Sequence, residues 1–212
     1  MYNEHGYGIV ENALEPEYYD NIKAYLNNTH WKPITSTAGK VSSEKDIIES
    51  VYKSSLAKLF FTEGRFTEDH YLGMCQPFIN CINKYFDIKQ IERIRAGLIF
   101  PQKKEVIHGP HVDYEYPHHT ALFYFCTEKG AGHTYVFDEV FDPYLYNTVA
   151  EQYDHKKDTM QVLDKIEAKE NTVLFFKGNV FHSSSSPKTI FKRIAVNINF
   201  IGFPRKVEES ND

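Results

Sequence analysis

The sequence is poor in cysteine, has no long apolar run and contains no block of basic residues. Its three cysteines, Cys75, Cys81 and Cys126, form no C-x-x-C motif, which predicts reduced thiols and an intracellular, cytoplasmic protein. No apolar stretch approaches the roughly 20 residues of a membrane-spanning helix, and the first residues do not resemble a signal peptide. We therefore expect no membrane partner.

Nucleic acid is not expected as the main partner either, because the formal net charge is −5 with neutral histidines. The 212 residues suffice for one sizeable core but not for two comfortable domains, so we expect a single domain over residues 1–212. Aromatic side chains are numerous, with 15 Tyr and 16 Phe. Such residues favour strands and ligand-facing surfaces.

The chain changes character near residue 90. Apolar residues before it recur at helical spacing, which predicts a mainly helical flank over residues 1–90. Short apolar runs after it predict about seven strands over residues 91–201. The expected helices are 15–27, 43–61 and 68–86. The expected strands are 7–11, 91–100, one that begins at His111, 120–127, 133–137, 162–168, 172–177 and 193–201. This order favours a mostly β (α+β) fold, an antiparallel sandwich or barrel with helical support.

One long segment, residues 138–158, separates two of the expected strands and is rich in Tyr and Asp. Long connections in compact domains usually form lids over binding sites or are disordered. We expect this segment to contain a helix near residues 143–153 and to border a substrate entrance.

The triplet His111-Val112-Asp113 places an imidazole and a carboxylate two residues apart. On a strand, alternate side chains share a face, so both groups can reach one point. His182, shortly after the apolar run 172–177, is the best candidate for a third ligand. Two histidines and one carboxylate with open positions suit a non-heme iron site. A three-histidine site that uses His108 or His133 is the alternative.

Arg193 opens the expected strand 193–201, shortly after His182. The apolar residues at 194, 196, 198 and 200 must share one face of that strand, which puts Arg193 and Asn197 on the other. A guanidinium binds a carboxylate through two parallel hydrogen bonds, whereas a lysine acts as a point charge. We therefore expect Arg193, rather than Lys192, to bind an anionic ligand.

Together these features resemble the 2-oxoglutarate/Fe(II)-dependent dioxygenase superfamily, and within it the prolyl-4-hydroxylase-like branch. The resemblance covers about residues 91–201 and is carried by H-x-D at 111–113, the aromatic strand 131–137, the run 171–176 and then His182, Pro187 and Arg193. It implies a double-stranded β-helix (jelly-roll) core with N-terminal helical support. It also implies an enzyme that hydroxylates a C–H bond of a peptide side chain (prolyl-type) or of a small molecule.

The same resemblance implies that His111, Asp113 and His182 bind Fe(II). Arg193 would contact the distal carboxylate of 2-oxoglutarate, O2 would be the second co-substrate, and ascorbate would be an additional reductant. The primary substrate is not named by the sequence.

The chain departs from the branch at two tyrosines that contact 2-oxoglutarate there, since Phe100 and Phe125 stand in their places. Tyr124 is the candidate that could replace them, provided that the strand parity differs. Asn197, on the same face as Arg193, is a further candidate for contact with 2-oxoglutarate.

Several alternatives stay open at this point. A non-catalytic, cupin-like metal-binding jelly roll could lose either Asp113 or Arg193, and the presence of both favours the enzyme. Arg93 and Arg95 are interpreted as part of a solvated sheet face, with the lining of a substrate channel as the alternative. The pair at 118–119, both histidines, is expected in a loop over the site.

Overall fold

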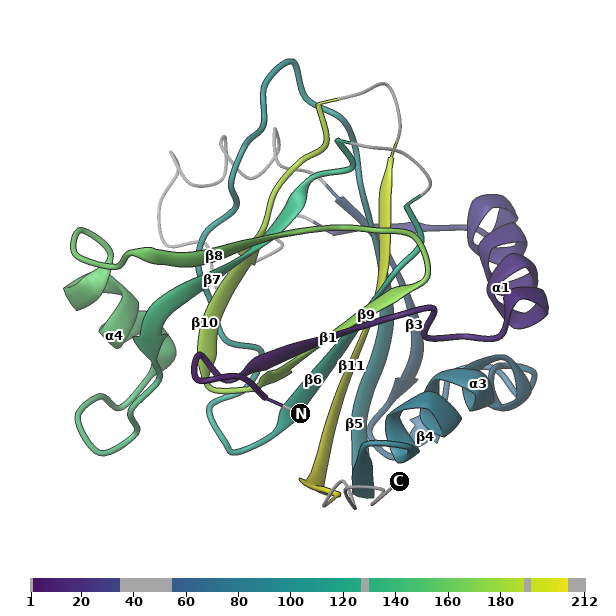
Figure 1. Cartoon of the computed structure of the whole chain (residues 1–212), viewed down its shortest axis with the longest axis horizontal. Coiled ribbons are helices and arrows are strands. Elements are labelled where there is room, and N and C mark those ends of the chain that lie inside the picture. The colour runs from purple at the N-terminus through teal and green to yellow at the C-terminus, as the bar shows by residue number, and fades with distance from the viewer. Residues whose placement is uncertain (1, 35–54, 127–129, 189–191, 206–212) are drawn as a thin grey trace, which may run out of the picture.

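The computed structural model describes residues 2–34, 55–126, 130–188 and 192–205. Their strands form two antiparallel sheets that face each other (Figure 1). The large sheet has the order β1 (Tyr7–Glu11), β9 (Thr172–Lys177), β6 (His119–Tyr124), β11 (Arg193–Pro204), β5 (Phe86–Ile99), β3 (Ser55–Thr62) and β2 (Lys32–Ile34), with β4 (Arg65–Phe66) beside β3. The small sheet has the order β10 (Val180–Ser184), β7 (His133–Val140) and β8 (Val162–Glu167). The expected jelly-roll core is confirmed.

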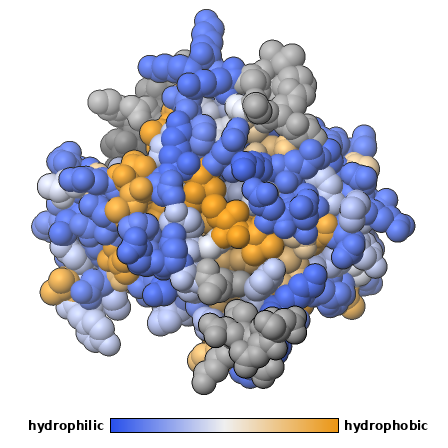
Figure 2. Space-filling view, in the orientation of Figure 1, coloured by the Kyte–Doolittle hydropathy of each residue, from blue (hydrophilic) through white to orange (hydrophobic). Residues whose placement is uncertain are grey.

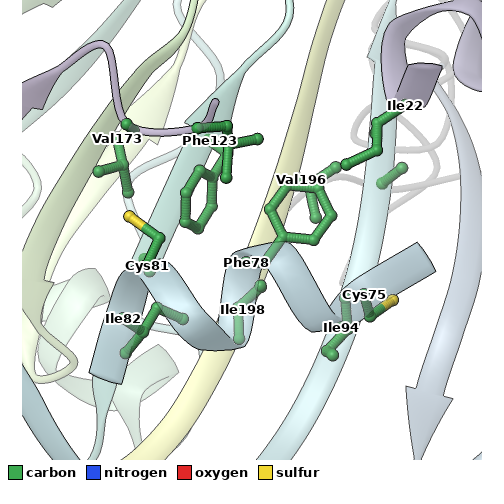
Figure 3. Close-up of a cluster of buried hydrophobic side chains, with 14 of the residues drawn as sticks. Ile22, Cys75, Phe78, Cys81, Ile82, Ile94, Phe123, Val173, Val196 and Ile198 are labelled. Carbon is green, nitrogen blue, oxygen red and sulfur yellow. The ribbon is translucent and has the colours of Figure 1, made fainter. Parts of the chain in front are cut away.

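Two helices, α1 (Pro16–Asn28) and α3 (Tyr71–Asn83), cover the outer face of the large sheet (Figure 1). The central strand β11 turns Ile194, Val196 and Ile198 toward them, and these side chains belong to the main hydrophobic core. Figure 3 shows Val196 and Ile198 of β11 with Phe78 of α3. Each fully buried side chain of this kind stabilises the fold by about 1.5–3 kcal/mol.

The opposite face of β11 looks toward the small sheet. Arg193, Ala195 and Asn197 line a pocket there, between the two sheets. The alternation predicted for this strand is therefore confirmed. It follows from the requirement that the large apolar side chains all reach the same core.

The helix expected over residues 43–61 is wrong where the structure describes it, because residues 55–62 form strand β3. This strand pairs along its length with β5, with an irregularity between Leu59 and Phe61. A short apolar run is compatible with the spacing of a helix and with that of a strand. Pairing with a distant strand decides which of the two forms. The part of the expected helix before residue 55 lies outside the described residues. The region before residue 90 is thus not only a helical flank, since β1 to β4 add to the large sheet.

The segment 138–158 contains a helix later than expected, α4 (Val149–Lys156), whose N-terminus is capped by Thr148. It packs on the outer face of the small sheet in a separate apolar cluster with Val112 and Phe181. No residue of this segment lines the pocket between the sheets. The segment therefore supports the strands of the site from outside and does not cover the pocket as a lid.

Apolar side chains are also visible on the surface. Figure 2 shows that they gather across the middle of one face and toward α4. The exposed apolar residues of the edge strands β1 and β8 include Ile9, Val162 and Leu163. In the described part of the chain, no helix is long and apolar enough to cross a membrane.

Candidate metal centre

His111 and His182 are brought together by backbone pairing. The amide of each donates to the carbonyl of the other, at 3.0 Å in both directions. His182 belongs to β10, a strand that the sequence did not suggest, and His111 forms an isolated bridge beside it. The two imidazole rings are 4.6 Å apart, and candidate donor atoms of His111, His182 and Asp113 all lie within 4.8 Å of one another. The three predicted ligands thus meet at one point.

Both imidazoles are oriented for metal binding. The Nδ1 atom of His111 lies 3.1 Å from the carbonyl of Gly109, and Nδ1 of His182 lies 3.1 Å from the carbonyl of Val180. A carbonyl can only accept, so Nδ1 carries the proton in each ring and Nε2 keeps its lone pair. Metal-binding histidines commonly use this arrangement.

The histidines are also held in the neutral form that a metal requires. Burial, and then the neighbouring His111, lower the pKa of His182 to about 4. Burial likewise lowers the pKa of His111. A metal ion therefore displaces no proton from either ring near neutral pH.

Asp113 is buried yet charged. Burial would raise its pKa, but the charge of Arg93 and the two histidines lower it well below its usual range. The Arg93 guanidinium lies 2.7 Å from Oδ1. The amides of Asn197 and Asn199 donate to Oδ2, at 3.0 and 2.8 Å. These contacts fix the carboxylate beside the two imidazoles, as outer partners of metal ligands do.

The pocket beside the triad is lined by His111, His182 and the residues of β11 that face inward. Arg193 is among the lining residues and is 2% exposed. The guanidinium donates to the carbonyl oxygens of His133 and Ser185 and to the hydroxyl of Thr134. Among the described residues these bonds use three of the five N–H groups that a guanidinium has. Two donors remain for a ligand.

Tyr124 lies below Arg193, with the guanidinium carbon 5.6 Å from the ring centre. Its hydroxyl is 2.8 Å from the hydroxyl of Thr134, and burial raises the pKa of Tyr124 to about 12. Phe125 points the other way and stacks on Tyr19 in the core. The inward side chain of this strand is therefore Tyr124, whereas Phe100 is exposed.

Glu105 is a site residue that the sequence did not single out. Burial favours its neutral acid, but the hydrogen bonds that it accepts outweigh burial and lower its pKa to about 2. The donors are Ser185 (2.7 Å), His133 (2.7 Å), Tyr135 (3.0 Å) and Lys165 (3.3 Å). Because the carbonyls of Ser185 and His133 accept hydrogen bonds from Arg193, Glu105 helps to hold Arg193 in place. A lone Glu in a polar connection gives no sequence signal of this role.

Arg93 and Arg95 do not belong to a solvated face. Arg93 pairs with Asp113, and Arg95 lines the pocket. The alternative interpretation, a lining role, is the one that the structure supports.

The other histidines stand apart from the triad. In the described part of the chain, the group formed by His111, Asp113 and His182 is the one cluster of possible metal ligands, so the three-histidine alternative is not supported. The loop over the site that is expected at the pair 118–119 is wrong for His119; only His118 of the pair lies outside a strand. His119 begins β6 and contacts the hydroxyl of Tyr2, and His118 is buried.

No family model matches this sequence, and no curated protein matches it. Solved structures do match. An oxidoreductase of the 2OG-Fe(II) oxygenase family from Burkholderia pseudomallei is 12% identical, with 96% of this chain and 90% of that chain covered and a TM-score of 0.59. The epimerase SnoN in complex with Fe3+, alpha ketoglutarate and nogalamycin RO is 15% identical, with 98% and 87% covered and a TM-score of 0.60.

A prolyl hydroxylase from Trichoplax adhaerens, in complex with a peptide fragment of hypoxia inducible factor, is 10% identical, with 94% and 84% covered and a TM-score of 0.55. At such identities the likeness concerns the fold. The chain therefore has the jelly-roll fold of the 2-oxoglutarate/Fe(II)-dependent oxygenases, including the prolyl hydroxylases.

Proposed function

We propose that the chain is an Fe(II)- and 2-oxoglutarate-dependent dioxygenase that hydroxylates a C–H bond of a peptide side chain or a small molecule. The observation that carries this proposal is the meeting, in one pocket, of two histidines and a carboxylate with a buried arginine that has donors to spare. A metal-binding module without catalysis has no need of Arg193. The solved structure that contains Fe3+ and alpha ketoglutarate in the same fold supports the proposal.

In this proposal Nε2 of His111, Nε2 of His182 and the carboxylate of Asp113 hold the iron. The donor set fits, because both imidazoles are neutral with Nε2 free and the carboxylate is ionised. Bound iron supplies the activation of O2, which no side chain can perform. Arg93, Asn197 and Asn199 keep the Asp113 carboxylate in place.

Arg193 binds the distal carboxylate of 2-oxoglutarate with its two remaining donors. The ring of Tyr124 and the hydroxyl of Thr134 hold the guanidinium in place from below. The reaction balances, since one oxygen atom of O2 enters the substrate C–H bond and the other enters succinate while CO2 leaves. Oxidation of substrate and of 2-oxoglutarate, by two electrons each, matches the four-electron reduction of O2.

The pocket also limits access of water to the reacting groups. His182, Ser183 and Arg193 are all buried. In such a site, fixed dipoles and charges act more strongly than in water.

The test is formation of succinate from 2-oxoglutarate by protein that has been loaded with Fe(II) without air and then exposed to O2. We expect succinate in proportion to protein, increased when an accepted substrate is present, and no succinate from the Asp113→Ala variant. A wild-type protein that binds Fe(II) but never forms succinate, across a panel of peptides and metabolites, would show a non-catalytic module.

A further inference from the structure

A second cation, partly buried, faces the pocket. Arg95 of β5 lies opposite Asn197 of β11 in the sheet register and lines the pocket together with His111. Its Nε is buried and has no hydrogen-bond partner among the described residues. Burial, and then the charge of Arg93, lower the pKa of Arg95, which is the mark of a cation in an unfavourable place.

Arg95 differs in this from the other two arginines of the site. Arg93 is paired with Asp113 at 2.7 Å. Arg193 has three acceptors. For Arg95, no ion pair with a carboxylate within residues 2–34, 55–126, 130–188 and 192–205 is present, and the oxygens of Asp113 are taken by other donors. Partial burial of a charge that has no ion-pair partner costs free energy, which a bound anion can offset.

There is space for such an anion beside Arg95. Gly97 follows it on the same face of β5 and also lines the pocket. A Cβ added at Gly97 would meet no described atom within 4 Å. The wall next to the guanidinium is therefore open rather than packed.

We propose that Arg95 binds the carboxylate of the primary substrate, so that this substrate is a small organic acid oxidised close to its acid group. The proposal rests on the proposed function and deepens it. Arg193 pairs with Ile99, four positions along β5 from Arg95, so the two arginines start roughly 13 Å apart along the strand. The two arginines therefore bind different anions. Arg193 binds the co-substrate and Arg95 binds the substrate.

A carboxylate fits this position better than a phosphate. A single guanidinium fork matches the two oxygens of one carboxylate. Phosphate sites usually collect further donors, such as several basic side chains or a row of backbone amides. Among the described pocket residues there is no lysine, and the other arginine is Arg193, which is already assigned.

The experiment compares N-acetyl amino acids, which carry a free carboxylate, with their primary amides, which are neutral. Turnover is measured as gain of one oxygen atom by mass, and binding is measured by calorimetry with 2-oxoglutarate but without O2. We expect the best acid to be preferred over its amide at least about tenfold in kcat/KM and in affinity. Arg95→Gln should abolish the preference, and Arg95→Lys should keep part of it.

Arg65→Gln is the matched control, because it removes the same charge from an exposed position on β4. It should keep the full preference for the acid. Gly97→Leu is a second, steric probe, which should fold normally and lose binding of the acid.

Three results would overturn the proposal. They are equal use of acids and amides by the wild type, a preference that survives Arg95→Gln, and preference for phosphomonoesters over carboxylates. A rise in the KM for 2-oxoglutarate in Arg95→Gln, with the acid preference intact, would assign Arg95 to the co-substrate instead. Failure of the proposed function would look different, because the wild-type protein would then form no succinate. Calorimetry without O2 would still measure whether Arg95 binds the acid.

Discussion

At the scale of single residues, His182 is the candidate ligand whose removal is simplest to interpret. Its ring is buried and its Nδ1 bonds only to a backbone carbonyl within its own strand. We expect His182→Ala to weaken Fe(II) binding by more than about 100-fold, since even outer partners of metal ligands contribute 10–100-fold. Anaerobic equilibrium dialysis measures the affinity, and circular dichroism checks that the fold is kept.

The matched control is His155→Ala, which removes an exposed imidazole of α4. It should bind Fe(II) like the parent protein. Tight binding by His182→Ala would show that the ligand set is different.

Arg193 and Lys192 are neighbours with opposite expected roles. Arg193 is buried in the pocket, whereas Lys192 is not among the lining residues. Arg193→Ala should raise the dissociation constant for 2-oxoglutarate at least tenfold, because a charge-assisted pair contributes about 1.5–3 kcal/mol. Lys192→Ala should change it little. Calorimetry without O2 measures both, and the reverse ranking would refute the assignment of Arg193.

At the scale of elements, the turn between β9 and β10 depends on Gly178. The amide of Gly178 donates to the carbonyl of His118 at 2.8 Å, and a Cβ at this position would overlap the His118 ring. Gly178→Ala should therefore destabilise the protein by about 1–3 kcal/mol, as overpacking does. Because β10 carries His182, iron affinity should fall as well.

Gly73→Ala is the control for this substitution. Gly73 lies in α3, and no atom is within 4 Å of the Cβ that would be added. Alanine in a helix is favoured over glycine by about 0.8–1 kcal/mol, so this variant should be more stable than the parent. Urea denaturation measures the unfolding free energy of both variants. Equal changes in Gly178→Ala and Gly73→Ala would contradict the role given to Gly178.

Some elements could be predicted from sequence because one local pattern sets them. The alternation of β11 is such a pattern and is found as expected. His111 and Asp113 do come together, but the strand expected to begin at His111 is wrong, since His111 forms only an isolated bridge with His182. Strand β3 could not be predicted, since its conformation is set by pairing with β5. The role of Glu105 was equally hidden, because its donors lie on separate parts of the chain.

At the scale of the whole molecule, Glu105 connects several segments and should affect stability in a pH-dependent way. Its pKa falls from 4.5 to about 2 on folding. A carboxyl whose pKa is lowered stabilises the fold above about pH 4.5, and this contribution is lost as the pH falls toward 2. Glu105→Gln should therefore cost roughly 3 kcal/mol at pH 7.

The difference in unfolding free energy between parent and Glu105→Gln should shrink as the pH falls below 4.5. Urea denaturation at a series of pH values measures it. Glu63→Gln, at an exposed turn, is the control and should show little difference. If the difference in unfolding free energy between parent and Glu105→Gln stayed constant down to acid pH, the ionised Glu105 carboxylate would not be what stabilises the fold.

The position of β11 has a consequence for how the protein is made. It is the last described strand in the sequence, yet it lies between β6 and β5 in the middle of the large sheet. The first strand, β1, pairs with β9, which is synthesised much later. Contacts of such long sequence separation make folding slow, because the chain entropy is lost before the contacts form. A nascent chain that ends before residue 193 would lack both the centre of its sheet and Arg193, so the core and the site must form together, after β11 has left the ribosome.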